Sequence, residues 1–135
     1  MPREEGSILI VIDSSGWIEF FADGQHAEEF ATRLRQPANV ITPTVAIYEV
    51  YKWIKRERSE NEAIEAVATM KKSQIADLTE EIALVAADLS LEHGLPMADS
   101  MMLAFARTSN AELVTTDAGF EKIEGVTVFS KKRST

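Results

Sequence analysis

Short apolar runs alternate with amphipathic segments along this sequence, and this alternation is what most limits the possible folds. The first run, Ile8 to Ile12, is apolar at every position, as expected of a strand covered by helices on both faces. The expected strands are Ile8 to Ile12, Asn39 to Thr42, Gln74 to Leu78, Glu112 to Thr115 and Val126 to Phe129. Strands separated by helices need right-handed crossovers, so the sequence predicts an α/β fold with a mostly parallel sheet between two helical layers.

Capping and helix-breaking residues indicate where the intervening helices begin and end. Gly24 and Pro37 stop the first two helices, and Pro43 suits the first turn of the third. Ser59 and Glu62 form a capping box for the fourth helix. The expected helices run from Ser14 or Ser15 through Phe21, from about Gln25 to Arg35, from Pro43 past Ile54, from Ser59 to about Lys72, from Thr79 to Gly94, and from Met97 to about Thr108.

Four acidic residues stand at different joints of this pattern. Asp13 ends the first apolar run, and Asp117 follows the fourth strand. Glu49 lies within a helix, and Asp99 opens another. Carboxylates beside the carboxyl ends of parallel strands point into the crevice where open α/β sheets bind ligands, and crowded acids need a cation between them. Oxygen ligands suit Mg²⁺ or Mn²⁺, so this layout predicts a divalent metal site.

Each acid also has a purely structural explanation. Asp13 could cap a helix, Asp99 could interact with a helix dipole, and Asp117 could form a turn. Glu49 is harder to explain in this way, because only Lys52 offers a local partner on a largely apolar helix surface. An unpaired carboxylate there is costly, which favours a bound cation.

Composition limits the class of protein. The 135 residues indicate a single domain, with a core of about residues 8–129 and a basic tail at residues 130–135. The absence of cysteine excludes disulfides, thiolate zinc sites and cysteine nucleophiles, and it fits a reducing cytoplasm. No signal peptide or membrane helix is expected, since the longest apolar run near the N-terminus is Ile8 to Ile12. Zinc-type histidine spacing, a Gly-rich phosphate loop and a Gly-x-Ser-x-Gly elbow are also missing.

The net charge of −8 argues at first against nucleic acid, because phosphate contacts usually come from Lys and Arg. The positive charges are nevertheless grouped in three clusters. These are Lys52, Lys55, Arg56 and Arg58; Lys71 and Lys72; and Lys131, Lys132 and Arg133. A metal-bridged phosphate would not need a basic protein, since the ions neutralise the carboxylates. The clusters could equally be solvated helix faces and helix-terminal charges.

Four phrases of the sequence carry a family resemblance. They are LIVIDSS, PTVAIYEV, GLPMADSMMLAFA and LVTTDAGF. In this order and at this spacing they resemble the PIN-domain ribonucleases, and most closely the VapC toxins of bacterial and archaeal toxin-antitoxin pairs. The resemblance covers nearly the whole chain, from Ile8 to about Phe129.

The resemblance implies a five-stranded parallel sheet in an α/β/α sandwich and a metal-dependent ribonuclease. The acids that would hold Mg²⁺ or Mn²⁺ are Asp13, Glu49, Asp99 and Asp117. Thr115 matches the hydroxyl residue that usually stands two positions before the last acid, and Ser14 would position a ligand or a water. The substrate would be single-stranded or loop RNA, cleaved to a 5′-phosphate and a 3′-hydroxyl. The family further implies frequent homodimers and a small cognate antitoxin protein as a partner.

Two other interpretations are open at this point. A phospho-acceptor receiver domain is also a small acidic α/β sandwich that binds Mg²⁺, but it needs an acidic pair at the end of the first strand. Asp13 instead stands between Ile12 and Ser14. The other is a PIN-like scaffold that binds RNA or protein without cleaving it. Only an activity assay distinguishes this scaffold from the nuclease.

The chain has more aromatic residues on two helices than a small sandwich needs to cover its sheet. Trp17, Phe20 and Phe21 belong to the first helix, and Tyr48 and Trp53 lie off the buried stripe of the third. We expect some of these rings to line a groove that binds an amphipathic antitoxin helix. An Arg of the antitoxin would then point toward the four acids. The alternative is that the rings belong to the core or to a homodimer contact.

Overall fold

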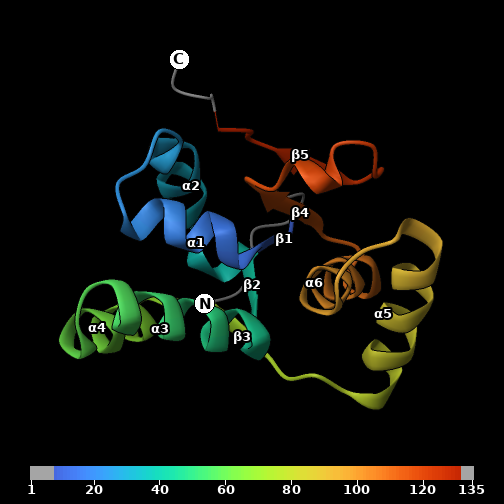
Figure 1. Cartoon of the computed structure of the whole chain (residues 1–135), viewed down its shortest axis with the longest axis horizontal. Coiled ribbons are helices and arrows are strands. Elements are labelled where there is room, and N and C mark those ends of the chain that lie inside the picture. Colours follow the sequence, from blue (N-terminus) through green and yellow to red (C-terminus); the bar gives the residue numbers. More distant parts are fainter. Residues whose placement is uncertain (1–7, 132–135) are drawn as a thin grey trace.

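A computed structural model describes residues 8–131, which form a five-stranded sheet with helices on both faces (Figure 1). The strands are β1 (Ile10–Ile12), β2 (Val40–Pro43), β3 (Gln74–Ala76), β4 (Glu112–Thr115) and β5 (Val126–Val128). Every neighbouring pair is parallel, and the order across the sheet is β3-β2-β1-β4-β5. The predicted α/β fold and its parallel five-stranded sheet are therefore confirmed.

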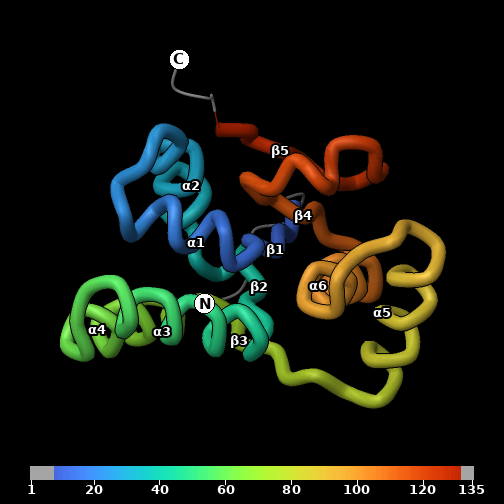
Figure 2. The backbone as a smooth tube through the Cα atoms, viewed as in Figure 1, coloured from blue at the N-terminus to red at the C-terminus, as the bar shows by residue number. Residues whose placement is uncertain are grey.

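Six α-helices within the described residues make up the two outer layers. They are α1 (Ser14–Phe21), α2 (Ala27–Leu34), α3 (Thr44–Glu57), α4 (Glu60–Met70), α5 (Glu80–His93) and α6 (Met97–Thr108). The chain steps from β1 to β2 to β3 in one direction, so α1 to α4 cover one face of the sheet (Figure 1). The long connection from β3 then carries the chain to α5 and α6 on the other face (Figure 2). Among the described residues, no helix combines the length and the apolar character that crossing a membrane would require.

The centre of the sheet is covered on both sides. Val11 and Ile12 of β1 and Leu113 of β4 have no exposed surface, which explains why these strands are apolar at successive positions. Gly16 allows α1 to lie close to this core, because a Cβ there would come within 2.4 Å of Phe30 and 2.8 Å of Ile12. The close approach brings the first turn of α1 against the carboxyl end of β1.

Several element boundaries differ from the sequence-based expectations. β1 begins at Ile10, and Ile8 lies outside it with its side chain 68% exposed. Pro43 ends β2 and occupies the cap position before α3, since its extended backbone belongs to the strand rather than to the first helical turn. Ser14 is already inside α1, and Asp13 holds the cap position. β3 ends at Ala76 rather than at Leu78, because it is a short edge strand that pairs only with β2.

The predicted N-cap residues of α4 and α5 are confirmed, but the capping box of α4 is half formed, since the Glu62 carboxylate accepts from the Ser59 hydroxyl at 3.2 Å. The side chain of Ser59 accepts a hydrogen bond from the backbone N–H of Glu62, and Thr79 does the same from Ile82. Gly94 ends α5 in the left-handed conformation at φ 69°, which glycine adopts without steric cost. Of the predicted basic tail, Lys132 and Arg133 lie outside the described residues.

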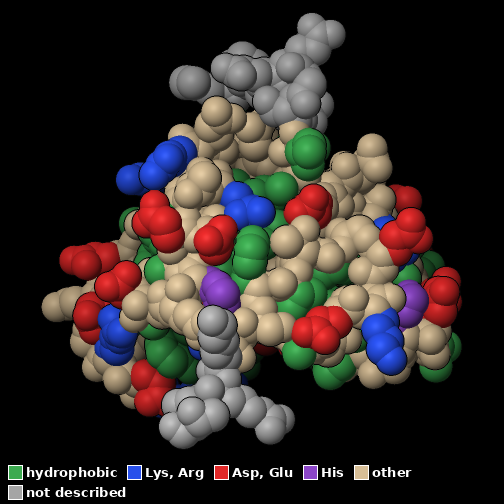
Figure 3. All heavy atoms as spheres, turned by 90° about the horizontal axis from the view of Figure 1, so that it is seen from above, with side chains coloured by type: hydrophobic (Ala, Val, Ile, Leu, Met, Phe, Trp, Pro, Cys, Tyr) green, Lys and Arg blue, Asp and Glu red, His purple; other side chains and the backbone are tan. Residues whose placement is uncertain are grey.

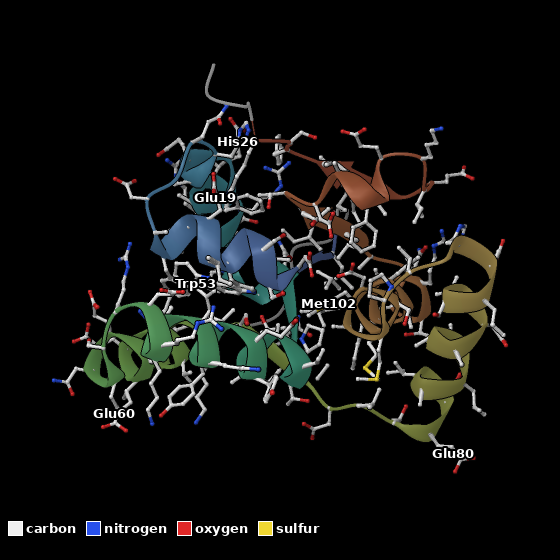
Figure 4. All side chains as sticks on the ribbon, viewed as in Figure 1. Glu19, His26, Trp53, Glu60, Glu80 and Met102 are labelled. Atoms are coloured by element: carbon white, nitrogen blue, oxygen red, sulfur yellow. The ribbon has the colours of Figure 1, made fainter. Side chains whose placement is uncertain are left out.

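A buried carboxylate on α1 was not singled out by the sequence pattern. Glu19 is only 2% exposed, and it accepts a hydrogen bond of 2.8 Å from the backbone N–H of His26. Its other oxygen forms an ion pair of 3.0 Å with Lys131 (Figure 4 labels Glu19 and His26). Gly24 is required beside it, because a Cβ there would lie 2.4 Å from the carboxyl group. Glu19 thus joins α1, the turn before α2 and the end of the described chain.

Candidate functional site

The sheet reverses its strand order between β1 and β4. β1 is followed by β2 on one side of it, and β4 is followed by β5 on the other side. The connections that leave the carboxyl ends of β1 and β4 therefore run in opposite directions. Asp13 follows β1, and Thr115 ends β4 two residues before Asp117. Open α/β sheets bind their ligands in the crevice at such a point. Two of the predicted site acids therefore lie where the topology provides a binding crevice.

A single cavity of about 360 Å³ brings the four predicted acids together. The acids in its wall are Asp13, Glu49, Asp99 and Asp117. The remaining wall residues are Ser14, Ser15, Ile18, Tyr48, Lys52, Trp53 and Arg56. Residues far apart in the sequence thus line one space that is formed by β1, the loop after β4, and α1, α3 and α6.

The carboxylate of Asp13 is held by two hydroxyl groups. Asp13 is 3% exposed, and its Oδ2 accepts hydrogen bonds from Thr115 Oγ1 at 2.8 Å and from Ser15 Oγ at 3.0 Å. Each hydroxyl also accepts a backbone N–H, that of Asp117 for Thr115 and that of Thr116 for Ser15. The Asp13 side chain makes no hydrogen bond that caps α1, so the helix-cap explanation for this side chain is wrong.

Glu49 is connected to α1 through Ser14. The hydroxyl of Ser14 donates a hydrogen bond of 2.8 Å to Oε1 of Glu49, which fixes one oxygen of this half-buried carboxylate. Lys52 had been the expected local partner of Glu49. Its ammonium instead lies 3.4 Å from the hydroxyl of Tyr48 and 5.5 Å from the centre of that ring.

Asp99 and Asp117 form the other side of the acidic wall. Burial raises the pKa of Asp99 to about 7, and the charges of Asp13, Asp117 and Glu49 add to this shift. A hydrogen bond between the Asp99 and Asp117 side chains also favours the protonated form of Asp99. Asp117 accepts a hydrogen bond of 2.8 Å from the backbone N–H of Gly119. The turn explanation for Asp117 is therefore correct, and the same residue faces the cavity.

The donor set fits a hard divalent cation. Carboxylate oxygens are the ligands that Mg²⁺ and Mn²⁺ prefer, and all four acids face one cavity. Burial also raises the pKa of Asp13, against the opposing effect of the Thr115 and Ser15 hydrogen bonds, so the acids lack a compensating positive charge. Within residues 8–131, however, no three Asp, Glu or His side chains are grouped closely enough to form a preassembled ion site.

Three features of the site were missed by sequence reasoning. Ser15 was considered only as a helix cap, yet its hydroxyl binds Asp13 directly. Lys52 and Arg56 were placed in a basic cluster, and Lys52 beside Glu49, but neither was assigned to the site, yet both line the cavity. Their positions three and seven residues after Glu49 on one helix were a signal that could have placed them on the same side of α3.

The fold and the site define a class of open, doubly wound α/β proteins with an acidic crevice at the reversal of strand order. The sequence matches the PIN domain family over residues 10–126, and the chain belongs to this family. No curated protein matches the sequence.

Solved structures with the same fold include components of toxin-antitoxin systems. A toxin-antitoxin complex from Klebsiella pneumoniae has a TM-score of 0.76 and 22% identity, covering 90% of this chain and 99% of that chain. VapC20 from Mycobacterium tuberculosis, a Sarcin-Ricin loop cleaving toxin, has a TM-score of 0.73 and 20% identity, covering 88% and 98%. VapBC2 from Rickettsia felis, bound to a DNA fragment from its promoter, has a TM-score of 0.73 and 13% identity, covering 91% and 98%. At these identities the similarity is one of fold.

Without divalent ions, the charge on Asp99 should destabilise the folded state at alkaline pH. Its folded-state pKa of about 7 lies above the ordinary value of 3.8, so the protonated carboxyl stabilises the fold at low pH, and this contribution is lost as the pH rises through about 7. In EDTA, Asp99→Asn should therefore melt above the wild type at about pH 8, and the difference should vanish near about pH 4. Circular dichroism measures both melting temperatures.

The control for this measurement is Asp88→Asn, which removes an exposed carboxylate from α5. It should melt with the wild type at both pH values. An Asp99→Asn variant that melts below the wild type at about pH 8 would show that burial of the Asp99 charge beside the other acids does not govern the stability of this site.

Proposed function

We propose that this protein is a divalent-metal-dependent endoribonuclease that cleaves single-stranded or loop RNA, and that it is the toxin of a VapBC-type pair. The observation that carries the proposal is the shared cavity of Asp13, Glu49, Asp99 and Asp117 at the reversal of strand order. These are the acids that the PIN resemblance implies for metal binding. The raised pKa of Asp99 supports a site that gains stability when a cation is present.

In this proposal the four acids would hold Mg²⁺ or Mn²⁺, and the ion would supply positive charge beside the phosphate and lower the pKa of the attacking water. Thr115 and Ser15 keep Asp13 in one orientation, and Ser14 does the same for Glu49. Both serine hydroxyls donate their hydrogen bonds to carboxylates, which supports water rather than a serine as the nucleophile. The products would carry a 5′-phosphate and a 3′-hydroxyl.

The shape of the site supports a flexible RNA substrate. The acids are reached through an open crevice, and a single strand or a loop can bend its backbone to present one phosphate there. The similar VapC20 is a Sarcin-Ricin loop cleaving toxin, which agrees with a looped substrate for this chain.

The strand order excludes one of the two alternative functions and leaves the other open. Receiver domains have the strand order 2-1-3-4-5, whereas this sheet is ordered β3-β2-β1-β4-β5, so the receiver interpretation is wrong. A PIN-like scaffold without catalysis has the same fold as the nuclease. It is the second candidate, and the assay below separates the two.

The purified protein should cleave single-stranded RNA only when Mg²⁺ or Mn²⁺ is present. Asp13→Asn, Glu49→Gln and Asp99→Asn should each lower the rate by orders of magnitude, because each removes a carboxylate that would hold the cation. Gel electrophoresis of a labelled oligoribonucleotide measures the rate, with Asp88→Asn as the control of unchanged activity. Cleavage that persists in excess EDTA, or an unimpaired Asp99→Asn, would refute the nuclease proposal.

An antitoxin would find two adjoining cavities on the α1 side of the fold, a mostly apolar one and one of mixed character. One, of about 320 Å³, is bordered by Phe20 and Leu34, and the other, of about 220 Å³, by Phe21 and Trp53. Trp17 also borders the larger of these cavities, but it has no exposed surface, so it belongs to the core at the cavity's base. Trp53 also lines the acidic cavity, which would give an Arg of a docked helix a short route to the four acids.

Phe20→Asp and Trp53→Asp should each abolish copurification with the small protein encoded by the neighbouring gene, because a charge in either cavity opposes an apolar helix face. Leu78→Asp is the matched control, since Leu78 is 44% exposed and lies between β3 and α5. Retention of the partner by both cavity variants, with unchanged melting temperatures, would exclude this docking surface.

A homodimer is also part of the proposal. Leu84, Leu91 and Met97 are 62%, 87% and 72% exposed on α5 and α6, on the opposite side of the sheet from the two cavities beside α1. Such exposed apolar side chains favour an interface with a second copy. Light scattering of the purified chain should give the mass of a dimer, and a monomeric mass at all concentrations would contradict it.

A further inference from the structure

The acidic cavity has a second wall of opposite charge. Lys52 and Arg56 line it together with Glu49, and all three belong to α3. The rise of an α-helix places Lys52 about 4.5 Å and Arg56 about 10.5 Å beyond Glu49 along the helix axis. The two cations therefore follow one another along one side of α3, on the C-terminal side of Glu49.

Neither cation neutralises the acids. Among the described residues, Lys52 and Arg56 form no ion pair with any of the four cavity carboxylates. Lys52 lies against Tyr48, and Arg56 forms an ion pair of 3.2 Å with Glu57. That pair is exposed on both sides, and exposed pairs are weak enough for a phosphate to replace them. The cavity is therefore negative at one end and positive along α3.

An aromatic residue stands between the two cations in the sequence and lines the same cavity. Trp53 is half-buried, lines the same cavity, and lies between α1 and α3 (Figure 4). Nucleobases stack on such rings in proteins that bind single strands, while Lys and Arg contact the phosphates between the bases. Cations and an aromatic ring on one helix face match the chemistry of a single-stranded nucleic acid.

The face of the molecule seen in Figure 3 has no basic surface that would attract RNA from a distance. The net charge is −8, and on the face seen in Figure 3 the coloured acidic and basic side chains are interspersed without a continuous basic patch. RNA is repelled by such a surface at long range. A local pair of cations beside the acids would counter this repulsion where the substrate must enter.

We propose that Lys52 and Arg56 bind successive phosphates of RNA next to the phosphate at the acids, and that Trp53 stacks on a base between them. This inference rests on the proposed ribonuclease function and adds the path that the substrate takes along α3. A phosphate is attracted to Lys52 and Arg56, and the planar fork of Arg56 matches phosphate geometry. The enzyme therefore requires RNA that extends beyond the cleaved bond along α3.

The test compares two double variants that remove the same charge. Lys52→Ala with Arg56→Ala removes the α3 cations, and Lys71→Ala with Lys122→Ala removes two exposed lysines outside the cavity. Fluorescence anisotropy with a labelled single-stranded oligoribonucleotide gives Kd over a range of salt concentrations. The α3 double variant should raise Kd by about tenfold per cation and lower the magnitude of the salt slope by about 1.4, since each phosphate contact contributes about 0.7. The control pair should match the wild type.

Trp53 gives an independent readout. RNA binding should quench the tryptophan fluorescence of the wild type, and Trp53→Leu should remove the quenching, because the other tryptophan, Trp17, is fully buried. In cleavage assays the α3 double variant should raise KM by a larger factor than it lowers kcat, as expected of groups that bind substrate away from the cleaved bond.

The outcomes separate this inference from the nuclease proposal. If the wild type binds RNA through these residues but cleaves none, the substrate path is supported and the nuclease proposal fails. If the α3 double variant binds RNA as tightly as the control pair does, the substrate path is wrong even if cleavage is observed. Loss of antitoxin copurification with unchanged RNA binding would assign the wall to the protein partner and overturn the inference.

Discussion

The buried carboxylate of Asp13 is the interaction on which the rest of the site depends. A charge with 3% exposure is tolerated only where donors surround it, and Thr115 and Ser15 supply those donors from β4 and α1. The two hydroxyls therefore join the strands at the reversal of strand order to the first helix. Gly16 completes this arrangement, because a larger residue would push α1 away from Ile12 and from the acid. The geometry of the crevice follows from satisfying one buried charge.

Two acids of this chain show how the same fold treats carboxylates with and without a cation. Glu19 is nearly inaccessible, yet Lys131 and the His26 N–H outweigh the effect of burial and hold its pKa below the usual value. Burial raises the pKa of Asp99 to about 7, and the charges of the other three acids of the cavity add to this shift. The groups that lower the pKa of Glu19, the His26 N–H and the Lys131 ammonium, have no counterpart at Asp99. The crevice thus has the electrostatic character of a cation site. Without a bound cation, the charged acids lower the stability of the fold.

The sequence predicted the fold and the four acids because both depend on local pattern. Apolar runs and helix caps define the layers. An acid directly after a short buried strand, such as Asp13, must lie at the carboxyl ends of the parallel strands. What the pattern could not predict depends on tertiary contacts. The burial of Trp17 comes from packing between helices, and Glu19 is paired with Lys131 from the opposite end of the chain. Pro43 was misplaced because a proline can end a strand as readily as it begins a helix.

The central claim is that the four acids at the reversal of strand order form a divalent cation site. Anomalous diffraction from crystals grown with Mn²⁺ tests it most directly, because the anomalous signal locates the ion without assumptions about activity. The account predicts a peak in the cavity, with oxygens of Asp13 and Asp99 among its ligands, and no peak there in crystals of Asp99→Asn. Well-diffracting Mn²⁺ crystals of the wild type with an empty crevice, or with the ion bound only elsewhere, would contradict the account.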